Sequence, residues 1–409
     1  MKISFAGGVD HVGSLGMMAE SGDTRLLFDY GLTPAKPPKY PMKVPHTDAL
    51  FLTHSHLDHI GMSPWLCGEY GSTIWGTEVT LEVAVVLLQD SIKIARLENF
   101  PIPYDISDVR RFTEESTILR YGDRPFVGPF TIRTMSAGHI PGSTMYKIDD
   151  GGKEVVFTGD INTVDTRLLE GISPPKCDTL VMESTYAGRE HPPRKRVEKE
   201  FIAKVEEVLD RGGKVIVPAF AVGRTQEIVQ VLDRIDEDKW LDGMGRRVSQ
   251  IYLRHGEFLR STGSLKKALD QFSFVRTPYQ RDKAAEAPIV VTTSGMLDGG
   301  PVLEYIRRRK DDKKTAILLT GYQVEDTNGR MLMDTGSIEI AGEVEKVNCE
   351  VCHFDFSAHA GHDELVSFAE GSGADEVILV HGDNRDELAK DIGSFAKVHT
   401  PSMGDTFHF

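Results

Sequence analysis

Four side chains that can bind a metal ion follow a short apolar run near residue 50. The run, 49–52, is long enough for a buried strand, and His54, His56, Asp58 and His59 come directly after it. In an extended chain, residues two apart point to the same side, so His54 and His56 can bind one ion together. A turn can direct Asp58 and His59 to a second ion. A lone histidine usually lies in a loop without such a role, but this cluster predicts a zinc site.

Other apolar runs also end in a metal-capable or acidic side chain. Five residues follow this pattern of a β run and then a functional group: His139, Asp160, Glu183, His359 and His381. In layered α/β folds, functional groups gather at strand ends and are carried on loops over a rigid scaffold. A single strand-end aspartate is usually a cap or a turn residue. Several such ends in one chain predict a shared site.

Two zinc ions a few ångströms apart hold a bridging hydroxide at neutral pH and stabilise the attacking and leaving oxygens of a phosphoryl displacement. Such a site needs about seven ligands, one of them an anionic bridge. The sequence supplies three ligands for a first ion, His54, His56 and His139. It supplies three for a second ion, Asp58, His59 and His381, and Asp160 can bridge the two ions.

The oxygen that leaves a phosphodiester also needs a proton. A histidine outside the ligand set can supply it when a neighbouring carboxylate holds up the pKa of the imidazole. His359 with Glu183 is the predicted pair, and the alternatives for His359 are a further metal ligand or a structural histidine. The predicted catalytic residues are this pair, His359 and Glu183, together with Asp58, which is also a predicted metal ligand.

Composition and charge narrow the class of protein. The chain has 409 residues, enough for two domains or for one domain inserted in another. No apolar run reaches about 18 residues, so we expect no membrane partner. The N-terminal residues do not resemble a signal peptide, and four cysteines make no disulfide framework, so we expect a cytoplasmic protein. The net charge of −15 disfavours nucleic acid, although divalent ions and local basic clusters can offset it.

The chain changes character near residue 188 and again near residue 345. Short strands alternate with helices at first, including an amphipathic helix over 79–97. A Pro-rich basic connector then leads into strands and helices that alternate as in parallel βαβ units. Near residue 345 the earlier pattern, in which a strand ends in a candidate metal ligand, resumes. We predict an α/β fold in which one domain, residues 1–187 and 345–409, is interrupted by a second domain, 188–344.

These motifs resemble those of the metallo-β-lactamase superfamily. His54-Ser-His-Leu-Asp-His59, followed by His139 and Asp160 and preceded by Asp29, is similar to its ligand motifs. Six further segments resemble the β-CASP nuclease branch: 183–186, 218–227, 293–296, 321–323, 357–359 and 380–382. Within this branch the chain resembles the archaeal homologues of the cleavage and polyadenylation specificity factor endonuclease, in the short form without a KH module.

The resemblance implies an αββα sandwich with an inserted α/β β-CASP domain, and a zinc-dependent ribonuclease with two Zn²⁺ in a cleft between the domains. Glu183, His359 and His381 would be the β-CASP motifs A, B and C, and a histidine at motif C is similar to the RNA-processing members. The implied substrate is single-stranded RNA and the implied product carries a 5′-phosphate. The implied assemblies are a homodimer and an RNA-processing or decay complex. Endonuclease and 5′→3′ exonuclease activity both stay open.

Several residues could bind the phosphates of such a substrate. Arg224 follows Gly223 at a helix start, where free N–H groups favour anions. Ser294 and Gly295 at a strand end, and Ser357 beside His359, are the other predicted substrate-binding residues. The basic runs 194–196, with Arg189, and 307–310 could follow an RNA backbone. The second run also lies late in a helix, where the helix dipole alone favours cations.

Two functions of other classes are alternatives. A catalytically silent scaffold subunit of an RNA-processing complex is disfavoured by the complete ligand set. A small-molecule hydrolase of the glyoxalase or lactamase type leaves the inserted domain unexplained. The sequence departs from the family pattern at four positions that are not predicted ligands: His11, Ala187, Asp326 and Gly361. These departures affect loop shape and substrate preference rather than the metal chemistry.

Overall fold

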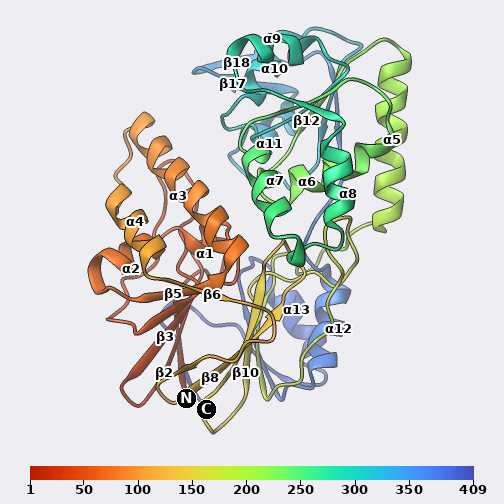
Figure 1. Ribbon diagram of the computed structural model, residues 1–409. Helices are drawn as coiled ribbons and strands as arrows, with labels where there is room; N and C mark the ends of the chain where they lie inside the picture. Colours follow the sequence, from red (N-terminus) through yellow and green to blue (C-terminus); the bar gives the residue numbers. More distant parts are fainter. The chain divides into compact units, whose positions relative to one another are not determined.

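The computed structural model describes residues 1–409, and the chain divides into two units (Figure 1). Unit 1 comprises residues 1–165, 170–190 and 358–409, and unit 2 comprises residues 166–169 and 191–357. The domain boundaries predicted at 187/188 and 344/345 stay predictions.

Unit 1 contains two seven-stranded sheets. The first has the order β22-β1-β2-β3-β4-β5-β6, with β1 (Lys2–Gly7), β2 (Gly16–Ser21), β3 (Thr24–Phe28), β4 (Ala49–Phe51), β5 (Thr73–Thr77), β6 (Ser116–Leu119) and β22 (Thr406–His408). The second has the order β21-β20-β11-β10-β9-β8-β7, with β7 (Phe126–Val127), β8 (Phe130–Ser136), β9 (Thr144–Asp149), β10 (Val155–Phe157), β11 (Thr179–Glu183), β20 (Glu376–Val380) and β21 (Lys397–His399). Both sheets are mixed, because antiparallel pairs at one end give way to parallel pairs.

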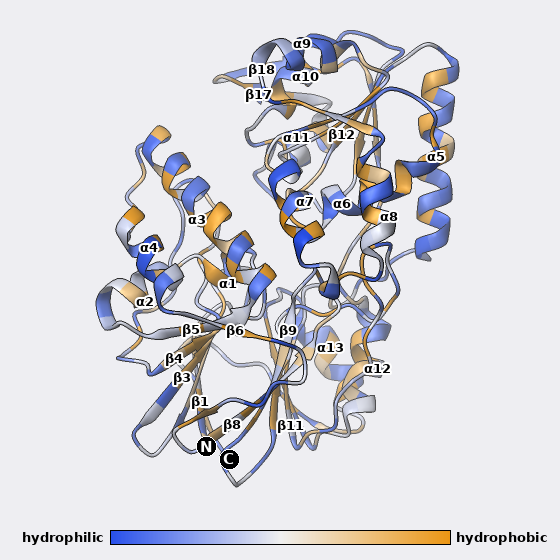
Figure 2. Ribbon diagram, viewed as in Figure 1, coloured by the Kyte–Doolittle hydropathy of each residue, from blue (hydrophilic) through white to orange (hydrophobic).

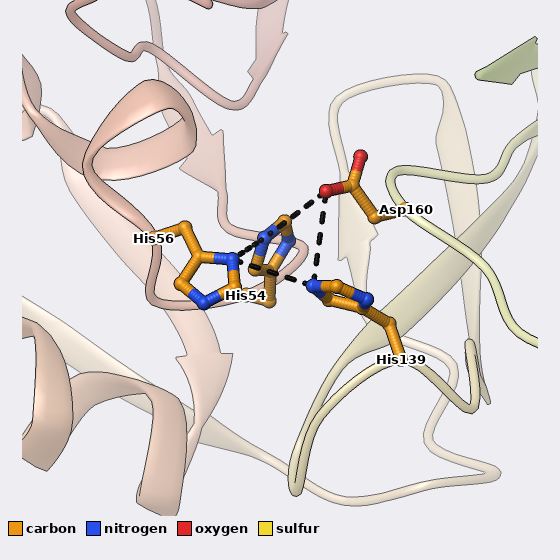
Figure 3. A group of neighbouring side chains, drawn as sticks. All are labelled: His54, His56, His139 and Asp160. Carbon is orange, nitrogen blue, oxygen red and sulfur yellow. Dashed lines mark hydrogen bonds and ion pairs between the residues drawn. The ribbon is translucent and has the colours of Figure 1, made fainter. Parts of the chain in front are cut away.

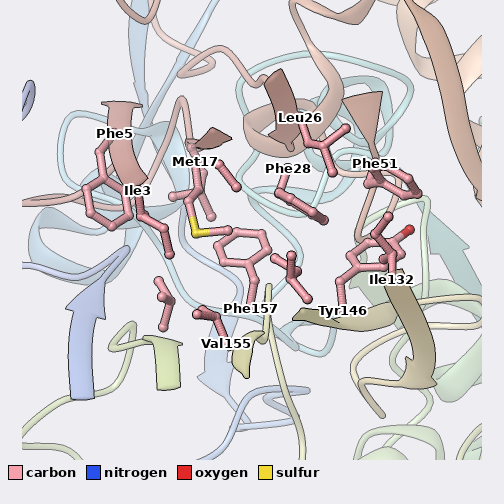
Figure 4. Close-up of a cluster of buried hydrophobic side chains, with 14 of the residues drawn as sticks. Ile3, Phe5, Met17, Leu26, Phe28, Phe51, Ile132, Tyr146, Val155 and Phe157 are labelled. Carbon is pink, nitrogen blue, oxygen red and sulfur yellow. The ribbon is translucent and has the colours of Figure 1, made fainter. Parts of the chain in front are cut away.

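Aromatic side chains join the two sheets of unit 1 (Figure 4). Phe28 on β3 stacks on Phe51 of β4 with ring centroids 5.3 Å apart. On the other sheet, Tyr146 and Phe157 lie 5.6 Å and 6.0 Å from the Phe28 ring. All four side chains are buried, and aromatic pairs at these separations add stability beyond the apolar area that they bury.

Helices cover the outer faces of both sheets of unit 1. Four helices pack on the first sheet: α1 (Leu57–Ile60), α2 (Ser63–Tyr70), α3 (Glu78–Leu97) and α4 (Ile106–Glu114). Two pack on the second: α12 (His362–Ser372) and α13 (Arg385–Ile392). Hydrophobic and hydrophilic residues alternate along α3, which confirms the amphipathic helix predicted there (Figure 2). None of the helices combines the length and the apolar character that a membrane crossing needs. The predicted αββα sandwich is confirmed.

Unit 2 is built on a parallel sheet of order β14-β13-β15-β12-β16-β19, which confirms the inserted α/β domain. Its strands are β12 (Val215–Pro218), β13 (Lys239–Asp242), β14 (Phe272–Phe274), β15 (Ile289–Thr292), β16 (Ala316–Leu319) and β19 (Glu350–His353). The four inner strands, β13, β15, β12 and β16, are fully buried, as expected when helices cover both faces. The helices are α5 (Arg194–Asp210), α6 (Arg224–Val231), α7 (Gly245–Arg254), α8 (Thr262–Leu269), α9 (Pro278–Glu286), α10 (Val302–Arg309) and α11 (Asn328–Thr335), and β17 (Ser337–Ile340) and β18 (Glu343–Lys346) form a separate hairpin.

One predicted strand is wrong. The segment 354–359 reads as an apolar run before His359, but the strand lies earlier, at β19, and pairs with β16 in unit 2. The rings of Phe354 and Phe356 instead pack edge-on against Phe201 of α5, each with a centroid separation of 5.3 Å. Alternating phenylalanines therefore anchor an irregular segment here rather than a strand.

Candidate active site

Three histidines form the first group of candidate ligands. The buried strand β4 leads into the loop with His54 and His56, and His139 lies in the loop after β8. His56 Nδ1 lies 3.0 Å from His54 Nε2 and 3.3 Å from His139 Nε2. Figure 3 shows the three rings and Asp160 turned toward one another. The structure therefore brings together the predicted ligands of the first ion.

Asp58, His59 and His381 form the second group. Asp58 and His59 lie on the single turn of α1, and His381 follows β20. His381 Nε2 lies 3.6 Å from Asp58 Oδ2. His381 has a φ of 56°, a left-handed conformation that is unusual for a non-glycine residue and is typical of functional sites.

Asp160, in the loop after β10, lies between the two groups. Its Oδ2 is 3.5 Å from His54 Nε2 and 3.8 Å from His139 Nε2. Its Oδ1 is 3.4 Å from His59 Nε2 and 3.7 Å from His381 Nε2. Most of these separations are longer than hydrogen bonds. Each carboxylate oxygen therefore faces one group of ligands, as an anionic bridge would.

The protonation of these residues fits a bound metal ion. Burial lowers the pKa values of His54 and His139 well below the usual range of histidine, and it lowers the pKa of His56 to about 4. Burial opposes ionisation of Asp160, but the neighbouring histidines, His59 foremost, hold the pKa of this carboxyl well below its ordinary value. The first group thus offers three neutral imidazoles, and Asp160 an anion, at neutral pH, which is the kind of donor set that zinc prefers.

Buried polar atoms without a hydrogen-bond partner also mark this site. They are Asp160 Oδ1, His59 Nε2 and both ring nitrogens of His381. Buried polar groups are almost always paired because desolvation without a partner costs free energy. A metal ion would satisfy Asp160 Oδ1 and the two Nε2 atoms, so the residues fit the metal that the chemistry requires.

Asp29, which the sequence indicated only as part of a motif, orients a candidate ligand. It follows β3, and its Oδ2 accepts a hydrogen bond of 2.7 Å from His59 Nδ1. Thr53, beyond the neighbouring β4, donates to Asp29 from its backbone N–H and its hydroxyl, each at 2.7 Å. These contacts leave His59 Nε2 facing Asp160. A carboxylate behind a ligating histidine fixes its tautomer and makes it a stronger ligand.

We expect Asp29→Asn to weaken metal binding by about 10- to 100-fold, because the amide cannot replace the charged acceptor behind His59. Competition with a chromophoric zinc chelator measures this change. Asp23→Asn, in the exposed turn between β2 and β3, is the matched control. An unchanged zinc affinity together with a lower Tm would mean that Asp29 only stabilises the fold.

His359 and Glu183 form the predicted ion pair. Glu183 ends β11, where it is buried and accepts a hydrogen bond of 2.6 Å from the Ile161 N–H. His359 Nδ1 lies 3.0 Å from Glu183 Oε2, and its ring packs against His139 with centroids 4.4 Å apart. Burial alone would lower the pKa of His359, but Glu183 more than offsets it and the pKa rises to about 9. His359 therefore carries a proton at neutral pH.

The same geometry is also compatible with the alternative role of His359 as a metal ligand. Its ring nitrogens and the carboxylates of Asp160 and Glu183 provide atoms within 4.8 Å of one another, a spacing that could also hold a metal ion. The roles of His359 as proton donor and of the seven candidate ligands stay predictions.

The predicted substrate-binding residues all lie in unit 2, whereas the predicted ligands and catalytic residues all lie in unit 1. Arg224 is the first residue of α6, directly after Gly223, and Ser294 and Gly295 follow β15. A Cβ atom on Gly295 would lie 2.9 Å from the Phe220 nitrogen, and Gln323 donates to the Gly295 carbonyl at 3.1 Å. The segments after β12, β15 and β16 therefore meet.

This meeting point is the carboxyl edge of a parallel sheet, where open α/β folds bind ligands. Ser357 lies apart from it in the chain, and its N–H donates to Asp355 at 3.0 Å. The roles of these residues in substrate binding stay predictions.

Several cations of the two basic runs are less available to bind RNA phosphates than the sequence indicates. In the run 307–310 every cation lies within ion-pair distance of a carboxylate of unit 2: Arg307 of Glu345, Arg308 of Asp282, Arg309 of Glu286 and Lys310 of Asp311. In the first run, Arg194 is largely buried against Glu227. Carboxylates of unit 2 therefore partly compensate the charges of 307–310, and Arg194 is held away from solvent, whereas Lys195 and Arg196 stay exposed.

Comparison with known proteins identifies the family. Family models match residues 9–219 as the metallo-β-lactamase superfamily, 225–332 as the Beta-Casp domain, and 344–401 as the Zn-dependent metallo-hydrolase RNA specificity domain. A crystal structure of a protein of unknown function from Enterococcus faecalis V583 has a TM-score of 0.66 at 13% identity, covers 99% of both chains and shares the fold.

Relatives with assigned names match nearly the whole chain. The chain is 37% identical to the probable RNase MJ4 of Methanocaldococcus jannaschii, over 99% of both chains. It is 34% identical to RNase aCSPSF2 of Saccharolobus solfataricus, over 98% of this chain and 84% of the relative. It is 31% identical to the transcription termination factor FttA of M. jannaschii, over 94% of this chain and 67% of the relative. The chain therefore belongs to the metallo-β-lactamase superfamily and, within it, to the β-CASP ribonuclease family, and it is a metal-dependent hydrolase.

Proposed function

We propose that this protein is a zinc-dependent ribonuclease that hydrolyses phosphodiester bonds of single-stranded RNA with two Zn²⁺ ions. The observation that carries the proposal is the position of Asp160, whose two oxygens face two separate groups of candidate ligands. His54, His56 and His139 would hold one ion, and Asp58, His59 and His381 would hold the other. Bound there, the ions would supply hydroxide at neutral pH and stabilise negative charge on the phosphate oxygens.

The chain's own residues have two tasks in this reaction. Glu183 holds His359 by Nδ1, so the proton that His359 can transfer is the one on Nε2. Transfer of that proton to the departing 3′ oxygen avoids a free alkoxide and leaves the 5′-phosphate on the other fragment. Asp29 keeps His59 oriented toward Asp160 throughout.

The names of the relatives and the family model that covers part of the candidate site together support RNA as the substrate. Two relatives over nearly the whole chain are named RNases, and the matched RNA specificity domain spans both His359 and His381. A catalytically silent scaffold subunit would have no need for an intact ligand set beside a buried Glu183–His359 pair.

Cleavage of three forms of one RNA tests the activity and its mode. Linear RNA with a 5′-monophosphate, the same RNA with a 5′-triphosphate, and its circular form are incubated with zinc-loaded protein, with and without a chelator. We expect cleavage that stops with chelator and returns with zinc. Internal fragments and opening of the circle indicate an endonuclease, whereas mononucleotides released only from the monophosphate RNA indicate a 5′→3′ exonuclease. No cleavage by protein that binds zinc stoichiometrically would favour the scaffold.

We also propose a reducing, cytoplasmic location, supported by four cysteines that are all free. A homodimer and an RNA-processing or decay complex are proposed assemblies that rest on the family resemblance. Light scattering of the purified protein with and without RNA tests the first of them.

A further inference from the structure

One buried carboxylate, Glu227 of α6, binds both segments by which the chain enters unit 2. Its side chain is 4% exposed. Glu227 Oε1 accepts a hydrogen bond of 2.9 Å from the Arg167 N–H, and Oε2 accepts one of 3.1 Å from the Leu168 N–H. Both donors belong to 166–169, the short segment that joins unit 2 while its neighbours on both sides belong to unit 1.

Arg194 extends this arrangement to the second entry point. The chain enters unit 2 again at residue 191, and Arg194 begins α5. Its Nη2 lies 2.7 Å from Glu227 Oε1, and its guanidinium carbon lies 4.9 Å from the ring centroid of Phe356. The side chain is 11% exposed, so this ion pair is largely shielded from solvent and from screening by salt.

Arg194 also binds the segment that leaves unit 2. Its Nη1 donates a hydrogen bond of 2.9 Å to the carbonyl of Ser357, the last residue of the unit. The next carbonyl, that of Ala358, accepts a hydrogen bond of 2.8 Å from His139 Nδ1. The residue after Ala358 is His359, the proposed proton donor. Two consecutive carbonyls are thus held by Arg194 and by a candidate ligand, directly before His359.

We propose that Arg194 and Glu227 are positioning residues that set the place of His359 in the reaction, an inference that rests on the proposed function. The guanidinium is a planar fork with donors at fixed angles, so Glu227 on one arm fixes where the other arm holds the Ser357 carbonyl. A displacement of about 1 Å at a catalytic group can cost about 100-fold in rate. A lysine has no such fork and cannot hold both acceptors in the same way.

The competing explanation is that the pair only stabilises unit 2. Two substrates separate these explanations, because a poor leaving group needs a proton and a good one does not. Single-stranded RNA releases a basic 3′ oxygen, whereas bis(p-nitrophenyl) phosphate releases a weakly basic phenolate. A misplaced His359 slows only the first reaction, and loss of folded or metal-loaded protein slows both.

The experiment compares Arg194→Lys, Glu227→Gln and a control with the unsubstituted protein. Arg194→Lys keeps a positive charge beside the buried Glu227 carboxylate, which limits the loss of stability of unit 2. The control Lys267→Gln removes an exposed ion pair of the same unit, in which Lys267 is 70% exposed and lies 2.9 Å from Asp233. Hydrogen exchange of the amides of residues 357–359 gives a readout that does not depend on activity.

For both variants we expect kcat on RNA to fall by up to about 100-fold, with zinc content and the rate on bis(p-nitrophenyl) phosphate unchanged. We also expect faster amide exchange at residues 357–359. The control keeps the wild-type values. Equal losses on both substrates, or full activity on RNA, would overturn the positioning role. No RNA cleavage by the unsubstituted protein would overturn the proposed function, and this role with it.

Discussion

His359→Ala lowers kcat for RNA cleavage by about 100- to 10,000-fold, the range expected when a positioned general acid is lost. The reason lies in the pKa of the leaving group: a sugar 3′ oxygen departs slowly without a proton. In the metal-free site Glu183 raises the pKa of His359 to about 9, so the imidazole holds a proton there at neutral pH. Initial rates on a labelled single-stranded RNA, at saturating substrate, measure the loss.

The chain offers a matched control for this variant. His399 pairs with Glu376 at 2.9 Å and is 20% exposed, against 19% for His359, but it lies at the edge of the second sheet on β21. His399→Ala removes the same kind of pair and keeps full activity. Zinc content of His359→Ala decides between its two roles, because a proton donor leaves it unchanged and a metal ligand lowers it. Full activity of His359→Ala would exclude both roles.

The spacing of residue types predicts which side chains meet at the candidate site, because strand ends converge at one edge of a layered fold. His54 and His139 are far apart in sequence, yet each follows a strand of unit 1 and their rings lie 4.9 Å apart. Asp29 is different. Its hydrogen bond to His59 depends on β3 lying beside β4, and this pairing is not encoded by any local pattern. The resemblance to the superfamily motifs was the signal that indicated it.

Burial explains the remaining differences between sequence and structure. Arg194 stands in a basic run that could follow an RNA backbone, but its ion pair with Glu227, 33 positions later, holds its side chain largely buried in unit 2. Phe354 and Phe356 alternate as strand residues do, and their rings pack on Phe201 of a helix. A run of charges or an alternation of apolar residues describes only the local sequence. Tertiary packing determines which side chain each of these residues contacts.

The second large effect is expected at Asp160, the candidate bridge. Zinc at about 1,000 times its Kd stabilises a protein that binds it only when folded by about 4 kcal/mol, which raises Tm by about 10 °C for a unit of this size. Asp160→Asn keeps the shape of the side chain and removes the negative charge that faces both ligand groups. We expect the zinc content to fall below two ions per chain and the zinc-dependent rise in Tm to shrink markedly.

The zinc-dependent rise in Tm, rather than Tm itself, measures the contribution of the bound metal to stability. Asp160 also attracts His59 in the metal-free protein, where it helps to hold the pKa of that imidazole well above its usual value despite burial. Asp160→Asn therefore changes the stability of the metal-free state as well, and subtracting Tm in chelator from Tm in zinc removes this contribution. Asp23→Asn, in an exposed turn of the same unit, keeps the full rise. A full rise and two bound ions in Asp160→Asn would contradict the bridge, since no other carboxylate in the two ligand groups faces both of them.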